Sequence, residues 1–145
     1  MPDASPCVCT ALRKASRALT RRYDEHLADS GMTITQFALL QNIARAPDLP
    51  LSRLADELVM ERTTLYRTLA PLERQGWLSL TTLGTTRVKT AALTDAGREA
   101  MQAAVPAWKA AQAEIVKGMG EADMQMLAIE LRNLAALSEG FVFRC

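Results

Sequence analysis

Apolar side chains recur every three or four residues through most of the chain, a spacing that predicts amphipathic helices. Two such segments open the sequence, from about Cys7 to Asp29 and from about Thr33 to Arg45. Two shorter helical segments follow over residues 51–58 and 63–75. Pro71 lies inside the second of these, where we expect a bend or an early end, because proline has no amide hydrogen to bond the preceding turn.

The pattern changes in the second half of the chain, where runs rich in threonine and valine alternate in polarity and predict a β-hairpin with a turn at 83–86. Beyond the hairpin we expect a long helix that Thr94 caps and Pro106 kinks. Gly118 and Gly120 should break that helix before a last one begins. These strands and helices span about residues 78–81, 87–93, 94–117 and 121–138.

Two short helices, a tight turn and a two-stranded hairpin make a winged helix-turn-helix, so the predicted fold is mainly helical with a small β wing. In this motif the first helix supports a second one, whose exposed face enters the major groove of DNA. Leu65, Leu69 and Leu72 mark the inner side of that second helix. Its outer side and the wing carry donors for bases and phosphates. The candidate DNA-binding residues are Arg53, Arg62, Thr63, Thr64, Tyr66, Arg67, Arg87 and Lys89.

Positive charge is concentrated in the same part of the chain. The whole sequence of 145 residues has a net charge of only +1. Residues 62–89 hold five basic side chains and one acidic side chain, whereas residues 91–145 hold five basic and seven acidic ones. A local positive field of this kind favours a polyanionic partner. Aromatic residues make up only 5% of the chain, which argues against a stacking platform for single-stranded nucleic acid.

The remaining composition narrows the class of protein. No apolar run is long enough for a membrane span, and residues 1–6 have the character of a flexible leader rather than of an export signal. The three cysteines are then most simply reduced thiols in a cytoplasmic protein. Without a glycine-rich phosphate loop or a paired-carboxylate motif, we expect no cofactor, no bound metal and no enzymatic activity. A redox enzyme that uses Cys7 and Cys9 as nucleophiles is the alternative class.

Four segments stand in an order and spacing that are specific when they are taken together. They are Leu54-Ala55-Asp56-Glu57-Leu58, Arg62-Thr63-Thr64-Leu65-Tyr66-Arg67, Leu72-Glu73-Arg74-Gln75-Gly76-Trp77 and Leu93-Thr94-Asp95-Ala96-Gly97. With them the chain resembles, over nearly its whole length, the MarR family of bacterial transcription regulators. The resemblance implies a homodimer in which residues 7–32 and 100–145 form a helical dimerisation region and residues 33–99 a DNA-binding lobe. It also implies repression at a pseudo-palindromic site in double-stranded DNA, with release by a small molecule or an oxidant.

The last predicted helix supports a dimer independently of the resemblance. Its apolar residues fall close to the heptad spacing of helices that pack against one another. The alternative is a stripe that packs against the chain's own core. The residues concerned are Met124, Leu127, Leu131, Leu134 and Leu137.

The wing departs from the pattern of the family. Where the family usually has Asp-x-Arg, with the aspartate orienting the arginine, this chain reads Thr85-Thr86-Arg87. Arg87 can still enter a narrow minor groove, but with the aspartate replaced we expect a weaker or more mobile wing contact. Lys89 lies two residues further along, on the same face of the strand, and is expected to meet phosphate.

Cys7 and Cys9 stand at the start of the first helix, where the helix dipole lowers the pKa of a thiol. This helix is similar to the first helix of the organic-hydroperoxide-sensing branch of the family. That similarity implies a sensor role for Cys9 and a hydrogen bond to it from Tyr23. Cys145 is a candidate second thiol if the two termini meet across the dimer. The alternative is that Cys9 is a small buried apolar residue and that the other two cysteines have no role.

Two further signals stay open at this stage. A thiophilic metal could be held by Cys7 and Cys9 together with Cys145. An aromatic carboxylate or phenol could bind between the terminal helices and the DNA-binding lobe, where Arg13 and Arg17 would pair with a carboxylate. The alternative for these arginines is simple exposure to solvent.

Overall fold

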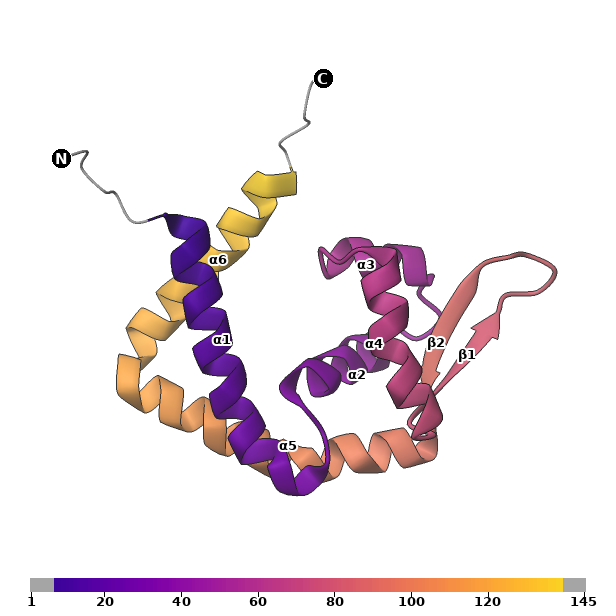
Figure 1. Ribbon diagram of the computed structural model, residues 1–145, viewed down its shortest axis with the longest axis horizontal. Coiled ribbons are helices and arrows are strands. Elements are labelled where there is room, and N and C mark those ends of the chain that lie inside the picture. The colour runs from indigo at the N-terminus through magenta and orange to yellow at the C-terminus, as the bar shows by residue number, and fades with distance from the viewer. Residues whose placement is uncertain (1–6, 140–145) are drawn as a thin grey trace. The chain divides into compact units, whose positions relative to one another are not determined.

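The computed structural model describes residues 7–139, which form six α-helices, one 3-10 turn and one antiparallel hairpin (Figure 1). The predicted fold, mainly helical with a small β wing, is confirmed. The chain divides into two compact units, Met1–Trp108 and Lys109–Cys145. No helix in the described range is both long and apolar enough to cross a membrane. In chain order the elements are α1 (Val8–Leu27), η1 (Ala28–Ser30), α2 (Ile34–Arg45), α3 (Leu51–Glu57), α4 (Arg62–Arg74), β1 (Leu78–Thr82), β2 (Lys89–Leu93), α5 (Asp95–Met119) and α6 (Glu121–Glu139).

Caps and a tight turn join α1 to α2. After η1, Gly31 adopts a left-handed conformation with φ of 69°, which glycine reaches without a steric clash. Thr33 and Gln36 then form a capping box, each side chain bonding the backbone amide of the other. Asp24 of α1 accepts a hydrogen bond of 2.7 Å from the amide of Ile34. The predicted break between the first two helices is therefore confirmed.

One apolar core joins α2, α3, α4 and the hairpin. Leu65, Leu69 and Leu72 of α4 are completely buried, as the spacing predicted. The rings of Phe37 and Trp108 stack with centroids 5.8 Å apart, which ties the middle of α5 to α2. Other buried members of this core are Leu27, Met32, Leu40, Ile43, Leu51, Leu54, Leu78, Ala91 and Leu93.

The helix α4 continues through Pro71 to Arg74, so of the predicted bend or early end, the early end is wrong. Proline removes one hydrogen bond inside the helix. The C-terminal end of the helix is closed by backbone bonds from later residues, which do not involve the proline nitrogen. The amide of Gly76, which has φ of 75°, bonds to a carbonyl of the last turn. The amide of Trp77 bonds to the Leu72 carbonyl at 3.0 Å, which completes a Schellman motif. The chain passes from this motif directly into β1.

The wing is a hairpin in which β1 and β2 pair over all their residues. Thr90 in β2 is buried, and its hydroxyl lies 3.0 Å from that of Thr81 across the hairpin. Pro50, just before α3, forms an isolated bridge with Thr90 and so links the wing to the helix-turn-helix. The predicted start of the second strand at Arg87 is wrong, because residues 83–88 form the loop at the wing tip.

The predicted cap of α5 is confirmed, since the Thr94 hydroxyl accepts a hydrogen bond of 3.0 Å from the amide of Gly97. α5 is continuous through Pro106. The predicted break at Gly118 is wrong, because this glycine lies inside α5. Gly120, with φ of 91°, separates α5 from α6.

The approach of α5 to the end of α4 makes Gly97 a sensitive position. A Cβ on Gly97 would overlap the carbonyl oxygen of Trp77, a backbone atom that accepts a hydrogen bond from the amide of Thr94. We expect Gly97→Ala to lower the free energy of unfolding by about 3 kcal/mol, as overpacking does in a tight interior. Urea denaturation followed by circular dichroism measures the change.

Gly118→Ala is the matched control for this prediction. Gly118 is also helical, but a Cβ there meets no atom within 4 Å. Alanine is favoured over glycine in a helix by about 1 kcal/mol, so this variant should be at least as stable as the wild type. Equal stability of Gly97→Ala and the wild type would contradict the close packing.

Candidate nucleic-acid interface

All the predicted DNA-binding residues are exposed and belong to one compact unit. On α4, an arginine and two threonines precede the first buried leucine, and a tyrosine and an arginine lie between the first and the second. One further candidate lies on α3, one in the wing loop and one on β2. The residues are Arg53, Arg62, Thr63, Thr64, Tyr66, Arg67, Arg87 and Lys89. Their contact with DNA stays a prediction, and their placement is compatible with it.

A tight turn, residues 58–61, sets α4 against α3. The amide of Met60 bonds to the Ala55 carbonyl at 2.9 Å, and the amide of Val59 bonds to the Asp56 carbonyl at 3.1 Å. Val59 has φ of 52°, in the left-handed region that a β-branched residue rarely adopts. These bonds close the helix-turn-helix and place the first residues of α4 at the surface.

The exposed face of α4 is electropositive. Its first turn carries Arg62 and no acidic side chain, and the free amides of a helix N-terminus add to the positive potential. Within residues 7–139 no ion pair involves Arg62, Arg67 or Arg87. Their guanidinium groups are therefore not neutralised by a neighbouring carboxylate, and each can donate to a phosphate or to a base edge.

The wing contains two contacts that were not predicted. The ammonium nitrogen of Lys89 lies 5.8 Å from the centroid of the Tyr66 ring. The Thr86 hydroxyl donates to the Leu83 carbonyl and accepts from the Val88 amide. The threonine contact follows a known tendency of hydroxyl side chains in turns and could have been inferred from sequence. The lysine–tyrosine contact joins a strand to a helix, and nothing in the spacing of the two residues signals it.

Both described cysteines are exposed free thiols, so the alternative of a buried Cys9 is wrong for the single chain. Cys7 is the N-cap residue of α1. The hydroxyl of Thr10, and then the backbone amides of Thr10 and Cys9, lower the pKa of the Cys7 thiol. Cys145 lies outside the described residues. In the described range no three His, Cys, Asp or Glu side chains gather as metal ligands would.

Tyr23 cannot bond to Cys9 within one chain. Both residues lie on α1, and at about 1.5 Å of rise per residue they are about 21 Å apart along the helix. Tyr23 is partly buried, and this burial raises the pKa of its phenol. The hydrogen bond that the resemblance implies would therefore have to join two copies of the chain.

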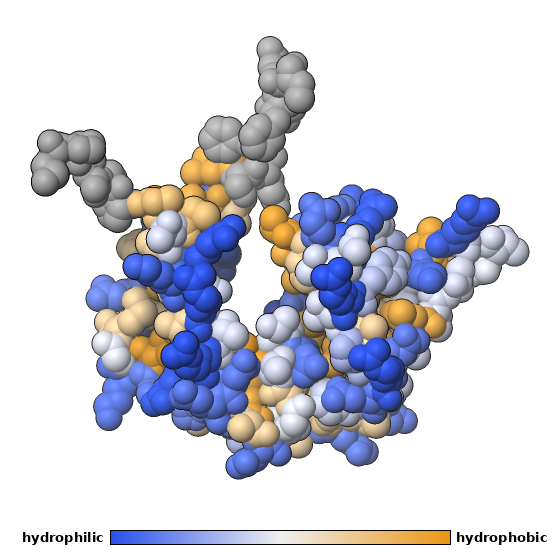
Figure 2. Space-filling model, viewed as in Figure 1, coloured by the Kyte–Doolittle hydropathy of each residue, from blue (hydrophilic) through white to orange (hydrophobic). Residues whose placement is uncertain are grey.

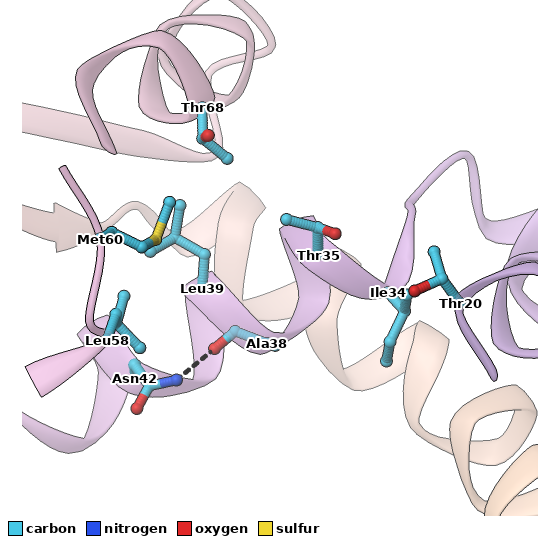
Figure 3. A pocket seen from close by; sticks show the side chains of 9 residues that line it. All are labelled: Thr20, Ile34, Thr35, Ala38, Leu39, Asn42, Leu58, Met60 and Thr68. Atoms are coloured by element: carbon cyan, nitrogen blue, oxygen red, sulfur yellow. Dashed lines mark hydrogen bonds between the residues drawn. The ribbon is translucent and has the colours of Figure 1, made fainter. Parts of the chain in front are cut away.

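A cavity of about 310 Å³ lies between α1, α2 and the helix-turn-helix (Figure 3). None of its lining side chains is ionisable. Its polar groups are threonine hydroxyls and the carboxamide of Asn42, whose nitrogen donates to the Ala38 carbonyl at 2.8 Å. The lining residues are Thr20, Ile34, Thr35, Ala38, Leu39, Asn42, Leu58, Met60 and Thr68.

The arginines predicted for a carboxylate ligand do not line this cavity. Arg17 and Arg21 border an adjoining open hollow along α1, together with Asp24 and Glu25, and Thr20 lines both the hollow and the cavity. Arg13 lines neither of the two. Figure 2 shows hydrophilic side chains along α1. The cavity and the basic face of α1 are thus neighbouring features that meet at Thr20.

The sequence model of the MarR family matches residues 32–82, which contain α2, α3, α4 and β1. No curated protein sequence matches this chain. The M. tuberculosis transcriptional regulator MosR is 37% identical, over 94% of this chain and 98% of its own, with a TM-score of 0.81. A structure of MosR in complex with DNA is 36% identical, over 95% of this chain and 100% of its own, with a TM-score of 0.86.

A more distant structure shares the fold. The transcriptional repressor CouR, bound to a 23-mer DNA duplex, is 22% identical, over 93% of this chain and 96% of its own, with a TM-score of 0.82. The family match covers the helix-turn-helix itself, and the likeness to MosR extends over nearly the full length of both chains. Together they show that this chain belongs to the MarR family.

Proposed function

We propose that the chain is a homodimeric transcriptional repressor that binds a pseudo-palindromic site in double-stranded DNA and leaves it when a chemical signal arrives. The observation that carries the proposal is the two-sided α4, which buries its leucines completely and exposes Arg62 and Arg67, neither of which forms an ion pair within residues 7–139. MosR, 36% identical, has been crystallised with DNA, which supports the same class of partner. The family consists of regulators, so the alternative of a redox enzyme is the weaker one.

The exposed side chains suit different parts of a DNA duplex. Arg67 faces outward from the second turn of α4 and suits bidentate hydrogen bonds to guanine in the major groove. Arg62 and Thr63, at the start of the helix, suit phosphate oxygens. Arg87, at the wing tip, suits a narrow minor groove, where the negative potential is strongest.

A second copy of the chain is the partner that best fits α6. Several of its apolar side chains are widely exposed in the single chain, including Met126 at 59% and Leu137 at 63%, and Figure 2 shows hydrophobic side chains over this helix. Apolar faces of this kind mark interfaces. α6 carries four acidic residues and one basic residue, whereas α1 carries five basic and two acidic ones. These opposite charges favour packing of terminal helices between copies.

An oxidant is the signal that the thiols at the start of α1 support best. A Cys7 or Cys9 thiolate attacks one oxygen of a hydroperoxide, so that an S–O bond forms, the O–O bond breaks and an alcohol leaves after protonation. The resulting sulfenic acid condenses with a second thiol, forming a disulfide and releasing water. The lowered pKa of Cys7 and the exposure of both thiols favour the first step.

A neutral small molecule is the second candidate signal, favoured by the cavity between α1 and the helix-turn-helix. The lining of hydroxyls, one carboxamide and aliphatic groups suits an uncharged ligand with one or two hydrogen-bonding groups. Met60 and Thr68 of the lining belong to the turn and to α4, so an occupant would touch the recognition element directly.

Arg67→Ala tests the proposed interface. If Arg67 reads a base, binding to a duplex from the promoter of the chain's own gene should weaken by about 1–3 kcal/mol, while binding to an unrelated duplex should change little. Fluorescence anisotropy at several salt concentrations measures both. Arg132→Ala, which removes the same charge from an exposed position of α6, should bind like the wild type. Wild-type affinity of Arg67→Ala would refute this placement.

Leu134→Glu tests the dimer. Leu134 is 38% exposed in the single chain, so a carboxylate there leaves the chain's own core intact but disrupts an apolar interface between copies. Sedimentation equilibrium should give a dimer for the wild type and a monomer for this variant. Gln125→Glu adds the same charge on the opposite side of α6 and should stay dimeric. A monomeric wild type would end the dimer proposal.

Cys7→Ser and Cys9→Ser test the oxidant signal. Each variant should bind DNA like the wild type, and the variant that lacks the sensor thiol should no longer be released by cumene hydroperoxide. Alkylation of Cys7 should begin at a lower pH than for an ordinary thiol, because its pKa is lowered, and Thr10→Val should move the profile to higher pH. Unchanged release in the double serine variant would eliminate the thiols as sensors.

A further inference from the structure

The wing tip of this chain is organised by Thr86, the residue directly before Arg87, whereas Thr85 stands at the position of the family's usual aspartate. The Thr86 hydroxyl donates to the Leu83 carbonyl and accepts from the Val88 amide at 3.3 Å. The Leu83 amide also bonds to the Val88 carbonyl at 2.9 Å, which closes the loop. Thr86 thus connects the two sides of the loop and fixes the backbone that flanks Arg87.

A second contact joins the wing to the recognition helix. The Lys89 ammonium lies 5.8 Å from the centroid of the Tyr66 ring, within the range of about 6 Å at which the ring face attracts a cation. Lys89 is the first residue of β2, and Tyr66 lies in the second turn of α4. The ring therefore holds the end of a long, flexible side chain beside α4.

We propose that Thr86 and Tyr66 are positioning residues, which hold Arg87 and Lys89 so that the wing and α4 meet DNA as one preorganised cationic surface. The proposal rests on the proposed binding of DNA and adds how its geometry is set. A free lysine side chain loses rotamer freedom when it binds a phosphate. A lysine that the ring already holds loses less, and the difference appears as affinity.

A double-mutant cycle tests the tyrosine. Tyr66→Leu removes the ring, Tyr66→Phe keeps the ring but removes the hydroxyl, and Lys89→Met removes the charge. With the duplex from the chain's own promoter, Tyr66→Leu should weaken binding about threefold to fivefold, as expected for an exposed cation–π contact. Tyr66→Phe should lose less affinity than Tyr66→Leu, because the ring that holds the lysine remains. In the Lys89→Met background, Tyr66→Leu should have no further effect.

The outcomes separate this proposal from the proposed function. If Tyr66→Phe loses as much affinity as Tyr66→Leu, the phenol hydroxyl contacts DNA itself and the positioning role is overturned. Additive effects of Tyr66→Leu and Lys89→Met overturn it as well. A wild-type chain that shows no salt-dependent binding to DNA would instead refute the proposed function. Thermal melting of each variant shows that the fold is retained.

Thr86 is tested by a pair of variants of similar size. Thr86→Val keeps the shape but removes the hydroxyl, and Thr86→Ser keeps the hydroxyl. Thr86→Val should weaken DNA binding severalfold and speed hydrogen exchange at the Val88 amide, which loses its acceptor. Thr86→Ser should restore both. Equal behaviour of the two variants in affinity and in exchange would overturn the role of Thr86.

Discussion

The rotation of α4 about its own axis is the constraint on which the DNA-facing chemistry depends. Leu65, Leu69 and Leu72 are completely buried, and each contributes about 2 kcal/mol through removal of its side chain from water. Because they recur at intervals of four and three residues, only one rotational setting buries all three. That setting turns Arg67 to the surface, whereas Arg62 is exposed because it is the first residue of the helix. The same orientation of α4 therefore buries its leucine side and exposes its polar side to solvent.

The junction at the C-terminal end of α4 fixes the wing relative to this helix. The amide of Thr94, at the start of α5, bonds to the Trp77 carbonyl at 3.1 Å, and its hydroxyl donates to the Gly76 carbonyl at 2.5 Å. One residue thus connects the end of the recognition helix, the root of the hairpin and the first turn of α5. The base of the wing is fixed by backbone bonds, whereas its tip relies on side chains. The proposed roles of Thr86 and Tyr66 lie in that second part.

Periodicity and capping residues were sufficient to predict the helices, the hairpin and the inner face of α4, because these features are local. The early end expected at Pro71 and the break expected at Gly118 are both wrong for the same reason. A residue that weakens a helix does not end it when packing and terminal caps supply the stability. Two other features depend on elements that folding brings together. They are the contact between Lys89 and Tyr66 and the cavity whose lining has no ionisable side chain. Spacing along the chain carries no signal for them.

The unusual backbone of Val59 has a consequence for where the lobe opens first. A left-handed conformation costs an L-residue about 1–2 kcal/mol, and Val59 is 63% exposed, so little packing offsets that cost. Local opening of the turn at 58–61 recovers this energy, which makes transient unfolding there cheaper than in α3 or α4 themselves. The first turn of α4 is thus attached to a turn whose backbone carries this local strain.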